Sequence, residues 1–206
     1  MKKIIVLGGG GHARVLIEML LLLKMDVIGF TDKNQSQEIS GVPYIGQDDV
    51  ILSYQPTEIF LINGIGSVGD QLKRKQLFLY FKSRGYSFAS VVHPSAVISS
   101  SAILGEGIQV MAGAVLQTGV RIGDNCIINT RASIDHDSQI GCHVHIAPGA
   151  TLSGGVQVAA EAHIGAGSVV IQNIRIGTKC IVGAGAVVVK NIPDLVRVAG
   201  VPARPI

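Results

Sequence analysis

Between residues 96 and 191 the chain repeats every six residues, without an insertion or a deletion. The residue at every sixth position from 98 to 188 is Ile, Leu or Val, at sixteen consecutive positions. Two positions earlier in each repeat, the residue is small or apolar. A bulky aliphatic residue and a smaller one in fixed phase are typical of a hexapeptide β-helix. Three hexads make one coil, and stacked coils bury the aliphatic column as a continuous core.

The first ninety residues follow a different pattern, in which apolar runs of strand length alternate with segments of helical character. The pattern predicts strands over 2–7, 27–31, 58–63 and 88–92, and helices over 13–23 and from beyond residue 66 to about 84. Strands that alternate with helices favour a small parallel α/β sheet. We therefore expect two domains, an α/β domain over residues 1–90 and an all-β parallel β-helix over 91–206.

Composition agrees with this division and excludes several classes of protein. Aromatic residues make up 4% of the chain and 26 residues are Gly, as narrow coils with tight corners require. The longest apolar stretch, residues 15–23, is far shorter than the roughly 20 residues of a membrane span, and no signal-peptide pattern precedes it. The net charge is +3, and no aromatic-studded basic patch favours nucleic acid. We expect a soluble, cytoplasmic protein.

The positions of the three cysteines are informative about the structure. Cys126 and Cys180 fall in the small inward column, three coils apart, and therefore roughly 14 Å from each other, beyond disulfide reach. No Cys or His spacing indicates a metal site, so we expect reduced thiols and no metal. Cys142, at a coil corner, lies in no motif that marks a reactive thiol, which disfavours an acyl-enzyme.

A glycine run, Gly8–Gly11, follows the first predicted strand and opens a helix at His12. Backbone N–H groups at such a turn bind phosphate, and a helix N-terminus favours negative charge. The run fits a dinucleotide fingerprint with Ala13 at its end and Asp32 after the second strand. The domain is about half the size of a dinucleotide-binding sheet, however, which favours a nucleotide sugar over NAD or FAD. A purely structural turn is the remaining alternative.

The densest polar stretch of the repeat region is residues 129–137, in which His136 lies between Asp135 and Asp137. A histidine that a carboxylate orients and makes more basic suits general-base catalysis near neutral pH. The alternative is that the Asp–His pair lies at a turn and has no catalytic role. His145 lies half a coil away from His136, so a site that uses both would lie between subunits around a three-fold axis.

Other polar residues are expected to have lesser roles. His163, one coil beyond His145, is expected to stack on it. His143 is expected to be exposed at a corner, and Lys73 and Arg74 to face solvent on the second helix.

Taken together, these motifs resemble the PglD/NeuD-type sugar acetyltransferases over essentially the whole chain. The resemblance rests on the glycine turn and His12, Gly29–Asp32, Asn63–Gly66, His93–Ala96, Asn129–Thr130, Asp135–Asp137, His145–Gly149 and Gly200–Ala203. It implies a Rossmann-like N-terminal domain joined to a left-handed β-helix. It also implies a homotrimer that uses acetyl-CoA, without a metal, at sites between subunits.

The resemblance assigns roles to particular residues. His136 matches the general base, and Asp137 stands where the relatives usually have Glu. Asn129 matches an acceptor contact, and His145 and the Gly154 N–H match groups near the acetyl carbonyl, where they would steady an oxyanion. The nucleotide of a UDP-linked amino sugar, the acceptor, would contact Gly10, Gly11, His12, Asp32 and Gly64. The adenine end of CoA would lie near Gly200 and Ala203, with Lys179, Lys190 and Arg204 as candidate phosphate partners.

Three functions follow from these observations. The first is N-acetylation of a nucleotide-linked amino sugar, such as a UDP-4-amino-4,6-dideoxy sugar, for glycan biosynthesis. The second is O-acetylation of a nonulosonic acid such as sialic acid, or its CMP form, for which Arg131 would bind the carboxylate. The third is a non-catalytic β-helix scaffold, which needs neither the His136–Asp137 pair nor the glycine turn.

Overall fold

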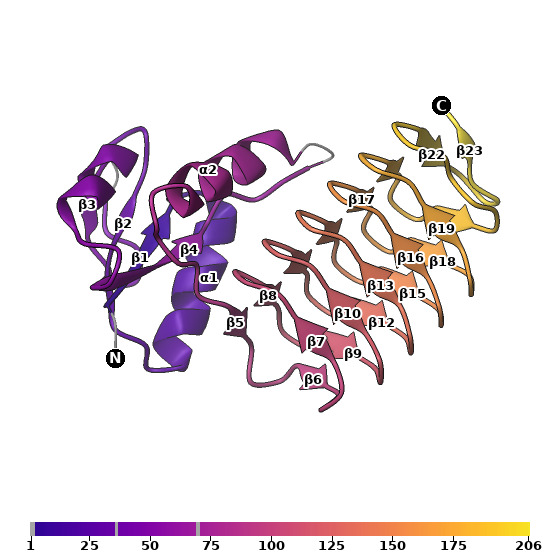
Figure 1. Cartoon of the computed structure of the whole chain (residues 1–206), viewed down its shortest axis with the longest axis horizontal. Helices are drawn as coiled ribbons and strands as arrows, with labels where there is room; N and C mark the ends of the chain where they lie inside the picture. The colour runs from indigo at the N-terminus through magenta and orange to yellow at the C-terminus, as the bar shows by residue number, and fades with distance from the viewer. Residues whose placement is uncertain (1–2, 36, 69–70) are drawn as a thin grey trace. The chain divides into compact units, whose positions relative to one another are not determined.

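The computed structural model describes residues 3–35, 37–68 and 71–206 (Figure 1). The packing of the backbone divides the chain into two compact units. Met1–Gly66 and Leu72–Val91 form the first, here called the α/β unit. Ser67–Gln71 and Val92–Ile206 form the second, the β-helix unit. Among the described residues, none of the helices combines the length and apolarity needed to cross a membrane.

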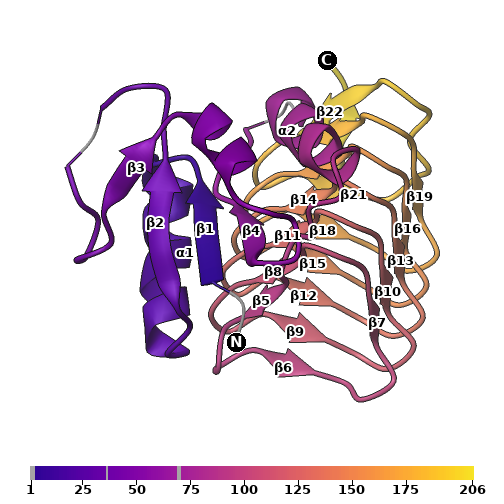
Figure 2. The same cartoon turned by 60° about the vertical axis from the view of Figure 1, so that its left-hand side comes forward.

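The α/β unit contains one parallel sheet of four strands in the order β3-β2-β1-β4 (Figure 2). Its strands are β1 (Lys3–Leu7), β2 (Val27–Thr31), β3 (Tyr44–Gly46) and β4 (Ile59–Asn63), and its helices are α1 (Gly11–Leu22), α2 (Leu72–Lys82) and a 3₁₀ helix (Asp48–Ser53). The α1 helix connects the parallel neighbours β1 and β2, as in a Rossmann-like crossover. The predicted parallel α/β sheet is confirmed.

Three local predictions for this unit were wrong or incomplete. Residues 88–92 do not form one strand, because Phe88 makes only an isolated parallel bridge to Leu61. Strand β5 (Val91–Val92) instead joins a β-helix sheet. The second helix runs from Leu72 to Lys82, whereas its end was predicted near residue 84, and residues 69–70 lie outside the described part of the chain. The short strand β3 and the 3₁₀ helix were not foreseen, since neither shows a clear hydrophobic period.

Arg74 does not face solvent, so this prediction was wrong. Its side chain is buried, and Nη1 donates hydrogen bonds to the carbonyls of Asn63, at 2.7 Å, and Ile65, at 2.8 Å. In return, the side-chain amide of Asn63 donates to the carbonyl of Arg74 at 2.9 Å. The buried guanidinium therefore satisfies the backbone carbonyls at the end of β4 and holds that loop against α2.

The β-helix unit winds the chain into coils of three short strands, and residues eighteen apart pair in parallel on each of three faces. The five-strand face contains β7 (Ile103–Leu104), β10 (Arg121–Ile122), β13 (Gln139–Ile140), β16 (Gln157–Val158) and β19 (Arg175–Ile176). The six-strand face contains β6 (Val97–Ile98), β9 (Val115–Leu116), β12 (Ser133–Ile134), β15 (Thr151–Leu152), β18 (Val169–Val170) and β21 (Val187–Val188). The eight-strand face contains β5, β8 (Gln109–Val110), β11 (Ile127–Ile128), β14 (His145–Ile146), β17 (His163–Ile164), β20 (Ile181–Val182), β22 (Arg197–Ala199) and β23 (Arg204–Pro205), the last of which is antiparallel to β22.

The interior of the coils is the one that the repeat predicts. The aliphatic column from Val110 to Val188 is buried at every coil, and the smaller column packs beside it in the same core. Truncating one such buried aliphatic side chain to Ala typically costs about 2–5 kcal/mol of stability. Cys126 and Cys180 lie inside this core, and all three cysteines are free.

The corners of the coils share a backbone conformation that the sequence pattern alone did not reveal. Every sixth residue from Gly107 to Gly185 has a positive φ, between 55° and 73°. Half of these fourteen residues are glycine, for which a positive φ carries little penalty. The others are Asn125, Arg131, Asp137, His143, Glu161, Asn173 and Lys179. The predicted requirement for glycine at corners is therefore met at only half of them.

Arg131 provides a test of this corner strain, because the corresponding residues of the neighbouring coils are Gly113, Gly149, Gly167 and Gly185. We expect Arg131→Gly to be about 1 kcal/mol more stable than Arg131→Ala, since both remove the side chain and only glycine relieves the left-handed φ of 56°. Urea unfolding followed by circular dichroism measures the difference. Equal midpoints for the two variants would show that this corner stores no strain.

Candidate active site

The glycine turn after β1 is held by Asp32. The Gly9 N–H donates to Asp32 Oδ2 at 2.7 Å, and the Asn34 N–H donates to Asp32 Oδ1 at 3.1 Å. A Cβ on Gly9 would lie 2.8 Å from the Phe30 ring and 3.0 Å from the Asp32 carboxylate, so the close approach requires glycine. Asp32 therefore acts first as a support of the turn, with both carboxylate oxygens engaged.

The end of β4 meets this turn from the other side. The Gly64 N–H donates to the Leu7 carbonyl at 2.8 Å, and a Cβ on Gly64 would lie 2.7 Å from that oxygen. A Cβ on Gly66 would lie 3.1 Å from the Cβ of His12. By contrast, a Cβ on Gly10 or Gly11 would meet no atom within 4 Å. The structure thus gathers the residues predicted to contact the nucleotide, Gly10, Gly11, His12, Asp32 and Gly64, at one edge of the sheet, with open space at the N-terminus of α1. Asn129, the other predicted acceptor contact, lies in the β-helix unit.

A hollow of about 490 Å³ adjoins this turn, lined by Gly9, Arg14, Glu18 and residues 37–40. Arg14 and Glu18 are exposed on α1 and one helical turn apart. The sequence analysis missed both residues, although their spacing of four along a helix that follows a glycine turn was visible. The hollow offers the cation and carboxylate that a nucleotide requires beside a phosphate-binding turn.

His136 lies at the corner between β12 and β13 and faces solvent, with 57% of its side chain exposed. Its Nδ1 lies 2.9 Å from Asp137 Oδ2, and its backbone N–H donates to Asp135 Oδ1 at 2.8 Å. The hydrogen bond to Asp137 raises the pKa of His136, desolvation opposes this rise, and the charges of Asp135 and Asp137 add to it. Because Asp137 engages Nδ1, Nε2 is the nitrogen that can accept a proton from a substrate.

Two features of the corner determine this arrangement. Asp137 has a φ of 58°, a conformation that aspartate tolerates better than most residues, and its short carboxylate reaches the imidazole. A Cβ on Gly154, one coil beyond His136, would collide with Nε2 and the adjoining ring carbons of His136. Gly154 therefore leaves room for the ring, and its backbone N–H has no acceptor among the described residues.

His145 and His163 stack as predicted, with paired backbone positions and ring centroids 5.0 Å apart in an edge-to-face arrangement. His145 is buried and has partners on both nitrogens. Nδ1 lies 3.0 Å from the Ser67 carbonyl and 2.9 Å from Ser67 Oγ, and Nε2 lies 3.0 Å from Asn129 Nδ2. The role of Ser67 was invisible in the sequence, because 78 residues separate it from His145.

The prediction that His143 is exposed was wrong. His143 is buried, and its Nδ1 lies 2.9 Å from Asn125 Nδ2 of the preceding coil. Burial also lowers the pKa of His163, which keeps that ring neutral against His145. His145 and His163 of the eight-strand face thus form a buried, ordered stack, whereas His136 lies exposed at another corner with a raised pKa.

Near the C-terminal coils, Lys190, Ala203 and Arg204 line a hollow of about 330 Å³. Lys179 lies 4.0 Å from Glu161, a separation that leaves its charge weakly paired. The structure therefore brings two of the three candidate phosphate partners, Lys190 and Arg204, close to Ala203.

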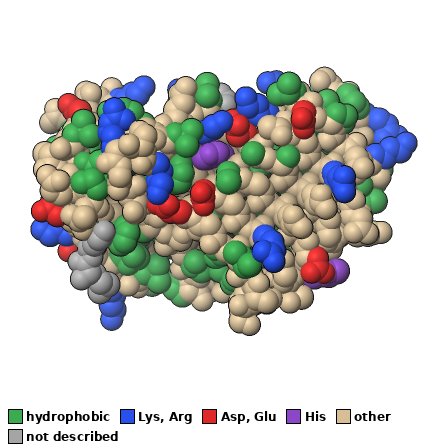
Figure 3. Space-filling model, viewed as in Figure 1, with side chains coloured by type: hydrophobic (Ala, Val, Ile, Leu, Met, Phe, Trp, Pro, Cys, Tyr) green, Lys and Arg blue, Asp and Glu red, His purple; other side chains and the backbone are tan. Residues whose placement is uncertain are grey.

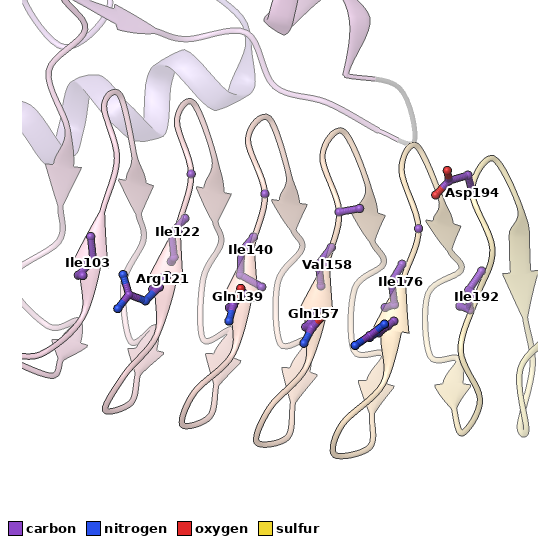
Figure 4. Close-up of a pocket in the computed structure, with 15 residues that line it drawn as sticks. Ile103, Arg121, Ile122, Gln139, Ile140, Gln157, Val158, Ile176, Ile192 and Asp194 are labelled. Carbon is purple, nitrogen blue, oxygen red and sulfur yellow. The ribbon is translucent and has the colours of Figure 1, made fainter.

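A groove of about 700 Å³ runs along the five-strand face and contains Arg121, Gln139, Gln157 and Asp194 (Figure 4). None of the predicted site residues lines it. Lys and Arg side chains are scattered over the molecular face in Figure 3 and form no continuous basic patch there. Among the described residues, no group of three His, Cys, Asp or Glu side chains could hold a metal ion.

Comparisons with known proteins agree with both units. A family profile described as the PglD N-terminal domain matches residues 3–81, and one described as the bacterial transferase hexapeptide, with six repeats, matches residues 137–172. The UDP-N-acetylbacillosamine N-acetyltransferase of Bacillus subtilis (strain 168) is 41% identical over 117 residues, or 54% of this chain. That match spans 52% of the length of the relative.

Two solved structures match the whole chain. PerB from Caulobacter crescentus, in complex with CoA and GDP-perosamine, is 39% identical with a TM-score of 0.93, over 100% of this chain and 98% of that one. The acetyltransferase domain of PglB from Neisseria gonorrhoeae FA1090, in complex with acetyl coenzyme A, is 37% identical with a TM-score of 0.93, over 100% and 99%.

The α/β unit and the left-handed β-helix, together with the hexapeptide profile, define an acyltransferase of the hexapeptide-repeat class. More narrowly, the chain belongs to the PglD/NeuD-type family of sugar acetyltransferases, as its resemblance predicted.

The pKa of His136 gives a pH-dependent prediction. A base must be deprotonated to act, so kcat/KM should rise with pH through the raised pKa of His136, above the ordinary value of about 6.5. Asp137→Ala removes the main cause of the rise, and its acidic limb should move to lower pH. NMR titration of the His136 ring in both proteins measures the shift directly. If Asp137→Ala left both the acidic limb of the kcat/KM profile and the titration of the His136 ring unchanged, Asp137 would not be the residue that raises the pKa of His136.

Gly154 gives a steric prediction. We expect Gly154→Ala to lower kcat by about 10²-fold, because the new methyl group displaces the His136 ring by a distance that matters for proton transfer. Thermal unfolding by circular dichroism should still show a folded β-helix. Gly149→Ala serves as a comparison, since a Cβ there meets no atom within 4 Å while its φ of 67° disfavours alanine, a strain that Gly154 does not carry. Equal kinetic losses in both variants would point to a general disturbance of the coils instead of displacement of His136.

Proposed function

We propose that the protein transfers the acetyl group of acetyl-CoA to the amino group of a nucleotide-linked amino sugar. The single observation that supports this most is the pairing of an exposed His136 with Asp137, next to Gly154, whose N–H has no acceptor among the described residues. A thioester is already activated, so such a reaction needs a base, an oxyanion donor and good positioning.

In the proposed mechanism, the amine nitrogen of the sugar attacks the carbonyl carbon of the thioester. Nε2 of His136 accepts the proton that the nitrogen loses, and the Gly154 N–H donates to the developing oxyanion. When the tetrahedral intermediate collapses, the C–S bond breaks, and the proton passes to the departing CoA sulfur. Asp137 holds the imidazole in the required tautomer and stabilises its charged form.

The nucleotide of the acceptor would bind at the glycine turn of the α/β unit. Its diphosphate would face the N-terminus of α1, where Gly10 and Gly11 leave open space, and Arg14 would supply a cation. We propose uridine as the base and a 4-amino-4,6-dideoxy hexose as the sugar. The relatives differ here, since the Bacillus subtilis enzyme is named for a UDP-sugar and PerB was crystallised with a GDP-sugar.

We further propose a homotrimer whose active sites lie between subunits. His136 follows β12 of the six-strand face, whereas Asn129 and His145 belong to the corner and strand of the eight-strand face. A site that uses both groups therefore needs a second copy of the chain. CoA would extend from Gly154 toward Gly200 and Ala203, where Lys190 and Arg204 could meet its phosphates.

Arg131 supports the second candidate, O-acetylation of a nonulosonic acid or its CMP form. The side chain is exposed two residues beyond Asn129, on a corner that is otherwise glycine in the neighbouring coils. A carboxylate-bearing acceptor would need such a cation. The scaffold hypothesis is set aside, because the chain belongs to a family of acetyltransferases.

Thiol release from acetyl-CoA, measured with a panel of acceptors, tests the proposal. The panel contains UDP-4-amino-4,6-dideoxy sugars, GDP-perosamine, dTDP-linked amino sugars, sialic acid and CMP-sialic acid. We expect the UDP-amino sugars to turn over fastest, and His136→Ala to lower kcat by about 10²- to 10⁴-fold.

The alternative outcomes are distinct. Preference for GDP-perosamine would overturn the choice of base and leave N-acetylation standing. Turnover of the sialic acids alone would move the protein to O-acetylation. Light scattering should give the mass of a trimer for both wild type and His136→Ala, so that loss of activity can be assigned to the missing imidazole. A monomeric mass would contradict the shared site.

A further inference from the structure

Ser67 belongs to the β-helix unit, although Gly66 before it belongs to the α/β unit. Its carbonyl oxygen and its hydroxyl both contact the Nδ1 of His145, at 3.0 Å and 2.9 Å. Both side chains are buried. Ser67, in the connection that follows β4, therefore contacts the histidine that the resemblance places near the acetyl group.

The partners of His145 define its tautomer. A backbone carbonyl can only accept a hydrogen bond, so the 3.0 Å contact with the Ser67 carbonyl requires that Nδ1 carry the proton. In the neutral ring Nε2 is then an acceptor, which agrees with the amide nitrogen of Asn129 at 3.0 Å. In this tautomer Nε2 cannot donate a hydrogen bond to a carbonyl oxygen or an oxyanion.

The orientation of the Asn129 amide is equally well defined. Its Oδ1 accepts a hydrogen bond from the Thr130 N–H at 2.8 Å, and a backbone N–H can only donate. The Nδ2 group must therefore face His145, and one of its two N–H bonds is used there. Within the described part of the chain the other N–H has no acceptor, and it is available to a ligand. His145 holds the amide in the orientation that presents this donor.

We infer that His145 is a positioning residue for Asn129, and that the Ser67 carbonyl fixes its tautomer. This inference rests on the proposed acetyl transfer. It replaces the expected role of His145 as an oxyanion donor with an indirect one, and it leaves the Gly154 N–H as the donor from the backbone. Asn129 then contacts the acceptor with an amide whose direction depends on His145 and, through His145, on Ser67. These residues are distant from Asn129 in the sequence.

The tautomer can be measured without turnover. The ¹⁵N chemical shifts of the His145 ring distinguish a protonated from an unprotonated nitrogen, and we expect Nδ1 to be protonated and Nε2 unprotonated in the wild-type trimer. Ser67→Ala retains the carbonyl and should retain this tautomer. A wild-type ring protonated at Nε2 would overturn the inference, as would a change of tautomer in Ser67→Ala. Neither result depends on whether the proposed acceptor is correct.

Two substitutions at position 145 separate the ring nitrogens. The amide of His145→Gln reaches the place of Nε2 and can still accept from Asn129, whereas the amide of His145→Asn reaches only the place of Nδ1. We expect His145→Asn to lower kcat/KM for the acceptor roughly tenfold, as the loss of one oriented hydrogen bond would, and His145→Gln to restore most of the activity. The KM for acetyl-CoA should stay near the wild-type value in both.

A double-mutant cycle with Asn129→Ala completes the test. If His145 acts through Asn129, the variant with both His145→Asn and Asn129→Ala should be no slower than Asn129→Ala alone. If His145 instead contacts the reacting atoms itself, the two losses should multiply, and the inference would be wrong. Thermal unfolding and light scattering of each variant verify that the trimer and the β-helix are intact.

Discussion

The path of the β-helix is the constraint on which the rest of the structure depends. A narrow coil has room for one aliphatic and one smaller side chain per hexad, and each corner requires a left-handed residue. Because no repeat is longer or shorter than six residues, every position stacks directly on the position eighteen residues away. The placement of His136 above the side-chain-free Gly154, and of His145 on His163, follows from this register.

The backbone of the α/β unit is fixed by glycines and polar side chains instead of by a repeat. Its turn is shaped by glycines that approach other backbone atoms too closely for a side chain, and by polar groups that satisfy the exposed ends of the strands. Asp32 holds the turn after β1, and the buried Arg74 holds the loop after β4. Asp32 was predicted to be a ligand and Arg74 to face solvent. Both therefore serve first to fix the backbone around the proposed nucleotide site.

Much of the fold could be predicted from the sequence, because the interior columns and the β1–turn–α1 pattern are periodic and local. The His136–Asp137 pair was also predictable, since the two residues are adjacent. Arg74, His143 and Ser67 were not, because each owes its environment to a partner distant in the chain. A helical arginine or a corner histidine looks solvent-exposed until the loop or the neighbouring coil that covers it is known. The positive φ at non-glycine corners was hidden for the same reason.

Strand β23 has a consequence beyond the site. It turns back antiparallel on β22, pairs Pro205 with Val198, and lets the N–H of Ile206 bond the Arg197 carbonyl at 3.0 Å. A parallel coil left bare at this point would offer a row of unpaired N–H and C=O groups to the first coil of another molecule. Proline cannot donate to such a ladder. The reversed strand thus covers the last parallel edge of the eight-strand face, and its Pro205 offers no N–H to a further strand there.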